Sequence, residues 1–246
     1  MPETSGKEKT VYQIFQKIAG RYDRSNVLIS LGLQGRWKRM LTGRLIKNLP
    51  EGAAVLDVCC GTGDIALELA RARRDLRVTG LDFSPAMLKE AEKRRRGRKN
   101  VRFLQGNALA LPFRDAVFDA AVISFGLRNT ADYGQTLREM VRVVKTGGSV
   151  ACLDSFVPGM RLVRPFYRFY FRNVMPLIGG GLKHRKEYRW LYLSTQSFLR
   201  PEQLVRMFRE AGLEDVCLES RMFGACALVS GCRAQSVTED LPVNCN

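Results

Sequence analysis

A short apolar strand that runs into a glycine-rich turn and then a helix is the feature that most constrains the fold. Residues 53–58 (AAVLDV) are almost all apolar, the turn 59–63 reads CCGTG, and residues 64–72 are rich in alanine and leucine. A short apolar run bounded by glycine is typical of a strand buried on both faces, as in a parallel sheet. The turn is neither G-x-G-x-x-G nor a P-loop, because no Gly-Lys-Ser/Thr follows it.

The same alternation of strand and helix continues along the chain. Ser84 and Pro85 match the N-cap and N1 preferences of a helix start. Further strands are predicted at 77–81, 101–105, 118–125 and 149–153, and a helix at 136–144 closed by Gly147 and Gly148. Strands that alternate with helices predict a doubly wound parallel α/β sheet.

Other segments frame this sheet. Helices are predicted at 11–20 and around Trp37, a helical cap of aromatic and basic residues at 158–199, and an antiparallel edge hairpin at 216–218 and 225–230. We therefore expect one domain over 1–233, with the cap insertion at about 158–200, and a flexible tail over 234–246.

Composition narrows the class of protein. No apolar run approaches the roughly 20 residues of a membrane-spanning helix, and the polar N-terminus does not resemble a secretory signal. The seven cysteines include no C-x-x-C pair, and His184 is the only histidine. We expect reduced thiols, no metal site and a cytoplasmic protein.

The net charge of +16 is concentrated in two segments, since residues 1–50 carry +7 and residues 158–200 carry +8. An arginine-rich solvated surface would explain this distribution. The more specific interpretation is that the two segments form one basic face that binds anionic lipid or nucleic acid.

Polar residues follow the first three predicted strands, where open α/β sheets bind cofactors. Asp82 ends the second strand, and a carboxylate there can accept both ribose hydroxyls of an adenosyl group. Asn107 and Ala108 follow the third strand, where an amide can meet the adenine edge. A helix cap at Asp82 and a turn at Asn107 are the structural alternatives. Taken together with the glycine turn, these residues predict an adenosyl cofactor, with NAD as the alternative.

The chain resembles the ubiquinone/menaquinone C-methyltransferase family, and within it the demethylmenaquinone methyltransferases, from about Val11 to Gly231. The resemblance rests on the segments 55–64, 80–84, 106–113 and 124–129 (SFGLRN), and on Tyr22-Asp23, Trp37-Lys38 and cap residues 169–177. It implies a class I S-adenosylmethionine (SAM)-dependent methyltransferase, with a Rossmann-like sheet, N-terminal helices and a helical cap. It also implies a SAM site formed by Asp57, Gly61, Thr62, Gly63, Asp82, Phe83, Asn107, Ala108 and Ser124.

The expected reaction is methyl transfer to a ring carbon of a polyprenylated quinol, with demethylmenaquinol as the acceptor. The ring carbon becomes electron-rich when a quinol hydroxyl loses its proton, so the reduced ring should be the substrate. Arg128 is expected to orient a water and stabilise the phenolate. Asp154 is a second candidate base, and Tyr22 a further catalytic candidate. Together with Arg128, the expected substrate contacts are Tyr22, Asn26 and Phe125.

The aromatic and basic cap suits a membrane surface, because aromatic rings favour the headgroup level and arginines favour lipid phosphate. Packing on the body with a solvated charged face is the alternative. We expect a prenylated quinol partner, a peripheral position on the inner membrane face and no nucleic acid partner, and a homodimer stays open.

The departures from the family pattern lie near the acceptor. Asp154 stands where a Glu is common, Val229 where a histidine is common, and Tyr192-Leu193-Ser194 where a more polar stretch is typical; Thr146 in the turn at 145–148 is expected to be harmless. A divergent methyltransferase acting on another phenolic or polyketide molecule therefore stays open. A nucleic-acid methyltransferase lacks its expected Asn-Pro-Pro-Tyr or Pro-Cys motif here. A catalytically dead binding subunit would not need the complete cofactor motifs.

Overall fold

Seven strands among the described residues (6–21, 27, 30, 32–175 and 185–234 of this computed structural model) form one sheet. The order across the sheet is β3-β2-β1-β4-β5-β7-β6. The strands are β1 (Ala54–Val58), β2 (Arg77–Asp82), β3 (Val101–Gln105), β4 (Phe118–Ser124), β5 (Val144–Ser155), β6 (Leu213–Arg221) and β7 (Cys226–Arg233). Pairing is parallel from β3 to β5, and β7 is antiparallel to both β5 and β6. The predicted doubly wound sheet with an antiparallel edge hairpin is confirmed.

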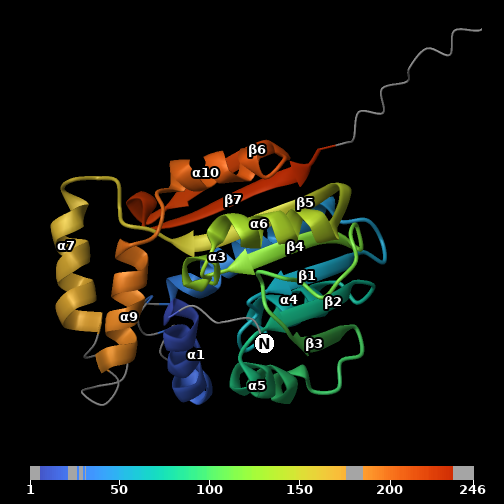
Figure 1. Cartoon of the computed structure of the whole chain (residues 1–246), viewed down its shortest axis with the longest axis horizontal. Coiled ribbons are helices and arrows are strands. Elements are labelled where there is room, and N and C mark those ends of the chain that lie inside the picture. The colour runs from blue at the N-terminus through green and yellow to red at the C-terminus, as the bar shows by residue number, and fades with distance from the viewer. Residues whose placement is uncertain (1–5, 22–26, 28–29, 31, 176–184, 235–246) are drawn as a thin grey trace, which may run out of the picture.

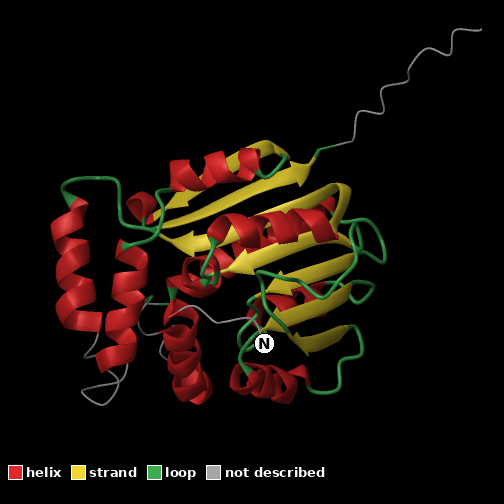
Figure 2. Cartoon of the chain, viewed as in Figure 1, coloured by secondary structure: helices red, strands yellow, loops and turns green. Residues whose placement is uncertain are grey.

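Helices cover both faces of this sheet (Figure 2). The covering helices are α3 (Leu33–Asn48), α4 (Asp64–Ala72), α5 (Pro85–Arg95), α6 (Tyr133–Val143) and α10 (Pro201–Glu210). Buried residues of α3 and α4 belong to one apolar cluster, and those of α6 and α10 belong to the other. The helices therefore divide between the faces, as a sheet with two apolar faces requires.

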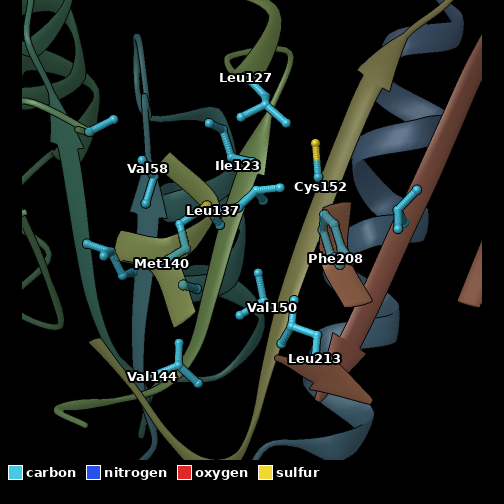
Figure 3. Close-up of a cluster of buried hydrophobic side chains, with 14 of the residues drawn as sticks. Val58, Ile123, Leu127, Leu137, Met140, Val144, Val150, Cys152, Phe208 and Leu213 are labelled. Carbon is cyan, nitrogen blue, oxygen red and sulfur yellow. The ribbon is translucent and has the colours of Figure 1, made fainter. Parts of the chain in front are cut away.

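Successive residues of the central strands point to opposite faces. In β4, Ile123 packs into the cluster beneath α6, whereas Val122 packs into the cluster beneath α4. Figure 3 shows Ile123 near Leu137 and Met140 of α6, with Phe208 of α10 close to the same layer. Burial on both faces explains why these strands are almost wholly apolar, the pattern that made them predictable.

Polar side chains set the starts of two helices. The Ser84 hydroxyl accepts a hydrogen bond from the Met87 N–H at 3.3 Å, which confirms the predicted N-cap before Pro85. Asp132 caps α6 by accepting from the Gln135 N–H at 2.9 Å. The helix predicted from residue 136 therefore begins three residues earlier, at Tyr133, because this cap satisfies its first free N–H groups.

The glycine pair does not close that helix as predicted. The helix ends at Val143, and β5 begins at once with Val144, which pairs with Phe118 of β4. The register then shifts, and the next pair is Ala120 with Ser149. Residues 145–148 are therefore an irregularity inside a strand longer than predicted, and both hairpin strands are also longer than predicted.

The N-terminal helix and the cap lie at one edge of the sheet. Figure 1 shows α1 (Gly6–Ile18), α7 (Val163–Phe169) and α9 (Arg185–Gln196) beside the end toward which β4 and β5 point. Short turns complete the described chain: η1 (Ala19–Arg21), η2 (Leu127–Asn129), η3 (Tyr170–Val174, a π-helix) and η5 (Met222–Gly224). The predicted helical cap is confirmed for its described residues, whereas the predicted C-terminal tail lies outside them from 235 onward.

The described cysteines are free thiols: Cys59, Cys60, Cys152, Cys217, Cys226 and Cys232. The residues that the structure describes contain no group of three metal-ligating side chains. None of their helices is long and apolar enough to cross a membrane.

Candidate functional site

A cavity of about 900 Å³ lies over the carboxyl ends of β1 to β4. Loops after all four strands line its floor, and α1 lines the opposite side with Lys9, Tyr12, Gln13 and Phe15. Among the predicted residues, this cavity collects the following: Gly61, Asp82, Phe83, Asn107, Ala108, Ser124 and Phe125. The loops after the four strands therefore line one cavity.

Asp82 joins the first two loops of the cavity. Its Oδ2 accepts from the Gly61 N–H at 2.8 Å, and its Oδ1 accepts from the Ser84 N–H at 2.9 Å. Burial raises the pKa of Asp82 to about 6, although hydrogen bonds from backbone N–H groups oppose the shift. Each carboxylate oxygen keeps a second lone pair, so both can still accept a hydroxyl from the cavity side.

The two glycines of the first turn have different tasks. At Gly61 (φ +56°) an added Cβ would meet no atom within 4 Å, so the backbone there is open to a ligand. At Gly63 (φ +81°) an added Cβ would lie 2.7 Å from the Phe103 ring, and this glycine also precedes α4 as its N-cap. Gly63 therefore packs the turn against β3, and neither of the described hollows beside the turn is lined by it.

Two non-glycine residues beside the cavity hold left-handed backbones, Cys59 (φ +56°) and Phe125 (φ +55°). Such conformations cost about 1–3 kcal/mol each and persist only where the surroundings impose them. The Phe125 ring packs against Trp37, with ring centroids 6.4 Å apart, and the Arg128 guanidinium lies 5.7 Å from its centroid. Burial raises the pKa of the Cys59 thiol, so a thiolate nucleophile is disfavoured there.

A buried hydroxyl shows that the cavity suits a polar ligand. The Ser124 Oγ is buried and has no hydrogen-bond partner among the described residues. The Asn107 Oδ1 accepts a hydrogen bond from the Leu109 N–H at 2.9 Å, which is the turn role given as the structural alternative. Asn107 also lines the cavity. Apolar surface from Phe83 and Met87 completes this part of the wall. The residues therefore fit an adenosyl group, with a carboxylate for hydroxyls and apolar walls for a ring.

Asp57 and Thr62 lie in a smaller hollow beside the glycine turn rather than in the main cavity. Asp57 accepts from the Ala66 N–H at 3.0 Å, which fastens the first turn of α4 to β1. Burial raises the pKa of Asp57 to about 8, and Lys38 partly opposes the shift. The two hollows share Cys59, Gly61, Ser124 and Phe125, so they adjoin.

Arg128 and Asp154 form a buried ion pair beneath the cap, with relative exposures of 6% and 0%. Arg128 Nη1 donates to Asp154 Oδ1, and the Arg128 N–H donates to Asp154 Oδ2 at 3.3 Å. The Ser155 N–H also donates to Oδ1, at 2.8 Å. Backbone N–H groups of Arg128 and Ser155 thus hold the Asp154 carboxylate in place, and the carboxylate in turn holds the Arg128 guanidinium. Neither residue lines the described cavity, although Phe125, Gly126 and Asn129 beside Arg128 do.

The loop that carries Arg128 is tied to both covering elements. Trp190 Nε1 of α9 donates to Asn129 Oδ1 at 3.4 Å. Lys7 Nζ of α1 donates to the Thr130 carbonyl at 2.7 Å and to the Tyr133 hydroxyl at 3.1 Å. The position of η2 is thus coupled to the cap and to α1.

Several residues of the site were not predicted. Tyr12, Phe15 and Met87 line the cavity, and Gln34 and Lys38 line the smaller hollow. The Tyr167 hydroxyl of α7 is buried and has no hydrogen-bond partner among the described residues. Burial raises the pKa of Tyr167, and the positive charge of Arg128 partly opposes this rise. Helical periodicity revealed their helices, but not which face would meet the sheet edge. The predicted residues Tyr22 and Asn26 lie outside the described residues.

Solved structures support the class of protein. A chain of the Haloferax volcanii complex between the Trm112 methyltransferase activator and a methyltransferase matches with a TM-score of 0.66 and 21% identity, over 90% of this chain and 98% of that one. A SAM-dependent methyltransferase from Thermotoga maritima matches with a TM-score of 0.61 and 22% identity, over 90% and 99%. With the cavity above, they define the class: this is a class I SAM-dependent methyltransferase fold.

The family follows from sequence. The profile of the ubiE/COQ5 methyltransferase family matches residues 3–233, and the chain belongs to that family. A demethylmenaquinone methyltransferase of Geobacillus kaustophilus is 44% identical over 92% of this chain and 97% of its own length. One from Halalkalibacterium halodurans is 42% identical over 98% and 100%, and one from Staphylococcus aureus 38% over 97% and 99%. The predicted enzyme class and the predicted methyl donor, SAM, are confirmed.

Cofactor affinity should fall as the pH falls through 6. The raised pKa of Asp82, about 6, means that acid protonates it in the free protein, and a protonated carboxyl no longer accepts two hydroxyls. We expect the SAM affinity measured by calorimetry to drop about tenfold between pH 7 and pH 5. Asp82→Asn should bind more weakly at pH 7 and lose this dependence; a flat wild-type profile would contradict the ribose contact.

Proposed function

We propose that this methyltransferase transfers the methyl group of SAM to a ring carbon of a reduced polyprenyl quinol, with demethylmenaquinol as the acceptor. The relatives named demethylmenaquinone methyltransferase support the acceptor, since they match over nearly their whole length. The single observation that carries the chemistry is the buried Arg128–Asp154 pair next to the cofactor cavity. A buried cation held in one orientation is suited to a phenolate that forms during the reaction.

In this proposal the cofactor lies along the loops after β1 to β4. Asp82 accepts the ribose hydroxyls, Phe83 and Ala108 contact the adenine ring, and Asn107 meets its polar edge. Ser124 donates its free hydroxyl toward the cofactor. The remaining predicted residues shape the turn and the adjoining hollow: Asp57, Gly61, Thr62 and Gly63.

When bound, SAM supplies a methyl group that is already activated as an electrophile. What remains for the protein is to hold the acceptor and favour its ionised form. Arg128 stabilises the negative charge on the quinol oxygen and orients a water that takes its proton. The ring carbon then gains the methyl group and loses its own proton to water, and the quinol oxygen regains a proton, which restores the aromatic quinol.

Asp154 is a positioning residue in this scheme. Its two oxygens already accept from Arg128 Nη1, the Arg128 N–H and the Ser155 N–H, which favours holding Arg128 over abstracting a proton. Phe125 lines the cavity, and its ring centroid lies 5.7 Å from the Arg128 guanidinium, so we propose it as an apolar contact of the acceptor ring. The proposed contacts from Tyr22 and Asn26 rest on the sequence alone.

The cap presents a surface suited to a bilayer. Leu162, the N-cap of α7, recurs at helical spacing with Phe166 and Phe169 of the helix, and the three are 79%, 77% and 63% exposed. Arg168 and Arg172 are exposed on the same segment. We propose that this apolar and basic face docks on anionic lipid, where a polyprenyl substrate resides, so that the enzyme is a peripheral protein of the inner membrane face.

We also propose that the chain forms a single domain over 1–233, is a cytoplasmic protein and forms a homodimer. A divergent enzyme acting on another phenolic molecule is the second candidate function. The observation that favours it is Asp154, where family members often carry Glu.

The direct test is transfer of a radiolabelled methyl group from SAM to short-chain demethylmenaquinol held reduced by dithionite. We expect label in the reduced quinol and none with the oxidised quinone as the control, because the quinone lacks the hydroxyl that ionises. An enzyme that binds SAM but labels only other phenols would favour the second candidate. One that binds SAM and labels no acceptor would favour a binding subunit.

Loss of Arg128 should separate catalysis from cofactor binding. Arg128→Ala leaves a buried carboxylate without its cation, so we expect a cost of about 3–5 kcal/mol in folding free energy. The double variant Arg128→Met/Asp154→Asn removes both charges and should recover most of that stability in urea denaturation. Its turnover should stay reduced by about a hundredfold or more, while its SAM affinity stays near wild type. Wild-type turnover in the double variant would refute the proposed role.

Removal of the exposed apolar side chains of α7 should release the protein from lipid. The triple variant Leu162→Ser/Phe166→Ser/Phe169→Ser should bind anionic phospholipid vesicles about tenfold more weakly or worse in cosedimentation, because each large apolar side chain contributes about 1.5–3 kcal/mol when buried. The matched control replaces Leu104, Val117 and Leu218, which are exposed outside the cap. Equal effects of both triple variants would argue against docking through the cap.

A further inference from the structure

The smaller hollow beside the glycine turn has polar residues that no part of the proposed site uses. α3 contributes Gln34 and Lys38 to its lining, opposite Gly61 and Thr62 of the turn. It adjoins the main cavity through shared residues of the β1 and β4 loops. A ligand that fills the main cavity therefore has a polar side chamber next to the glycine turn.

Lys38 is held firmly in this hollow. Its Nζ lies 2.6 Å from Asp64 Oδ2, and its side chain is only 12% exposed. Arg94 pairs with the same carboxylate and also donates to the Thr62 carbonyl at 3.0 Å and to the Thr62 hydroxyl at 2.9 Å. Asp64 is therefore fastened to α5 by Arg94, independently of Lys38.

Two cations lie at the hollow beside the glycine turn. Two cations, Lys38 and Arg94, share the single carboxylate of Asp64. Asp57 is the other acidic residue of the lining, and burial raises its pKa to about 8, so it is mostly uncharged at neutral pH without a ligand. Because two cations meet at one carboxylate and Asp57 is mostly uncharged, a further anionic group beside Lys38 is favoured.

The two ends of the site differ in chemistry. Asp82, Phe83 and Asn107 line only the main cavity and offer hydroxyl acceptors and an apolar wall. The hollow offers the Lys38 ammonium, which pairs with Asp64, together with the Gln34 amide and the buried carboxyl group of Asp57. A zwitterionic α-amino acid moiety matches this second set, with its carboxylate toward Lys38 and its ammonium donating to the Asp57 carboxyl group, which can accept a hydrogen bond in its protonated form as well.

We propose that Lys38, assisted by Gln34, binds the α-carboxylate of the methionine moiety of the cofactor. This inference rests on the SAM site of the proposed function but not on the acceptor. The competing explanation is that Lys38 only fastens α3 to α4 through Asp64. A structural role of that kind would affect every ligand of the site alike.

The test compares two ligands that differ only in the carboxylate. Calorimetry of Lys38→Met with S-adenosylhomocysteine should show an affinity about 10–100-fold below wild type, the effect of losing one charge-assisted bond. The decarboxylated analogue, which keeps the amino group, should bind the variant and the wild type equally. Lys47→Met is the matched control, because Lys47 is exposed in the last turn of the same helix.

Lys38→Arg keeps the charge and should retain most of the affinity, which guards against a folding defect in the methionine variant. Equal losses for both ligands, or no loss for S-adenosylhomocysteine, would overturn the proposal. Wild-type protein that binds neither ligand would also overturn it. Wild-type protein that discriminates as expected but methylates no quinol would leave Lys38 supported and count against the proposed acceptor alone.

Discussion

The parallel register of the central strands is the constraint on which the rest of the site depends. Val58 of β1 pairs with Leu81 of β2, and Asp82 pairs with Gln105 of β3, so the three strands end level with one another. Hydrogen bonds then fasten the loops across this edge: the Cys60 N–H donates to the Leu81 carbonyl at 3.0 Å, and the Gly106 N–H donates to the Asp82 carbonyl at 3.0 Å. Residues far apart in the sequence become neighbours because parallel strands present all their carboxyl ends on one side.

On that edge, burial gives the carboxylates different tasks. Asp82 is the last residue of β2, and Asp57 and Asp154 are the last residues but one of β1 and β5. Each of the three is at most 5% exposed. Asp57 fastens a helix, Asp82 fastens the glycine turn and faces the cavity, and Asp154 holds a guanidinium. Only Asp154 has a full charge partner within hydrogen-bond distance, and burial raises the pKa of the other two. A bound cation or hydroxyl group would offset the cost of burying the charged forms of Asp57 and Asp82.

The cap and α1 meet the body at the same short turn, η2. Trp190 of α9 donates to Asn129 of η2, and Lys7 of α1 donates to Thr130, the residue after η2. A turn held by both elements can keep Arg128 in one orientation although its neighbours, Phe125 and Gly126, form a cavity wall. This arrangement is preorganisation in the ordinary sense, because the orientation is fixed before the acceptor arrives.

Local patterns in the sequence predicted the sheet well because its strands are buried on both faces. The bounds of β3 were predicted to the residue, and Ser84 was predicted as a cap, since both follow from composition and short-range bonding. The start of α6 was misplaced because Asp132 lies outside the apolar period on which the prediction relied. The irregularity at residues 145–148 was missed because a register shift depends on the partner strand, β4, and not on β5 alone.

By itself, the sequence determined the order of strands and helices, the glycine turn, the acidic end of β2 and the family, because each is carried by contiguous residues. Only the tertiary structure decided that Arg128 and Asp154 are one ion pair, that Lys38 stands in the hollow beside Gly61, and that α1 covers the cavity. Arg128 and Asp154 are 26 positions apart in the sequence, as are Lys38 and its partner Asp64. Helical periodicity states that a helix has an apolar face, but the packing of the whole chain decides which surface that face meets.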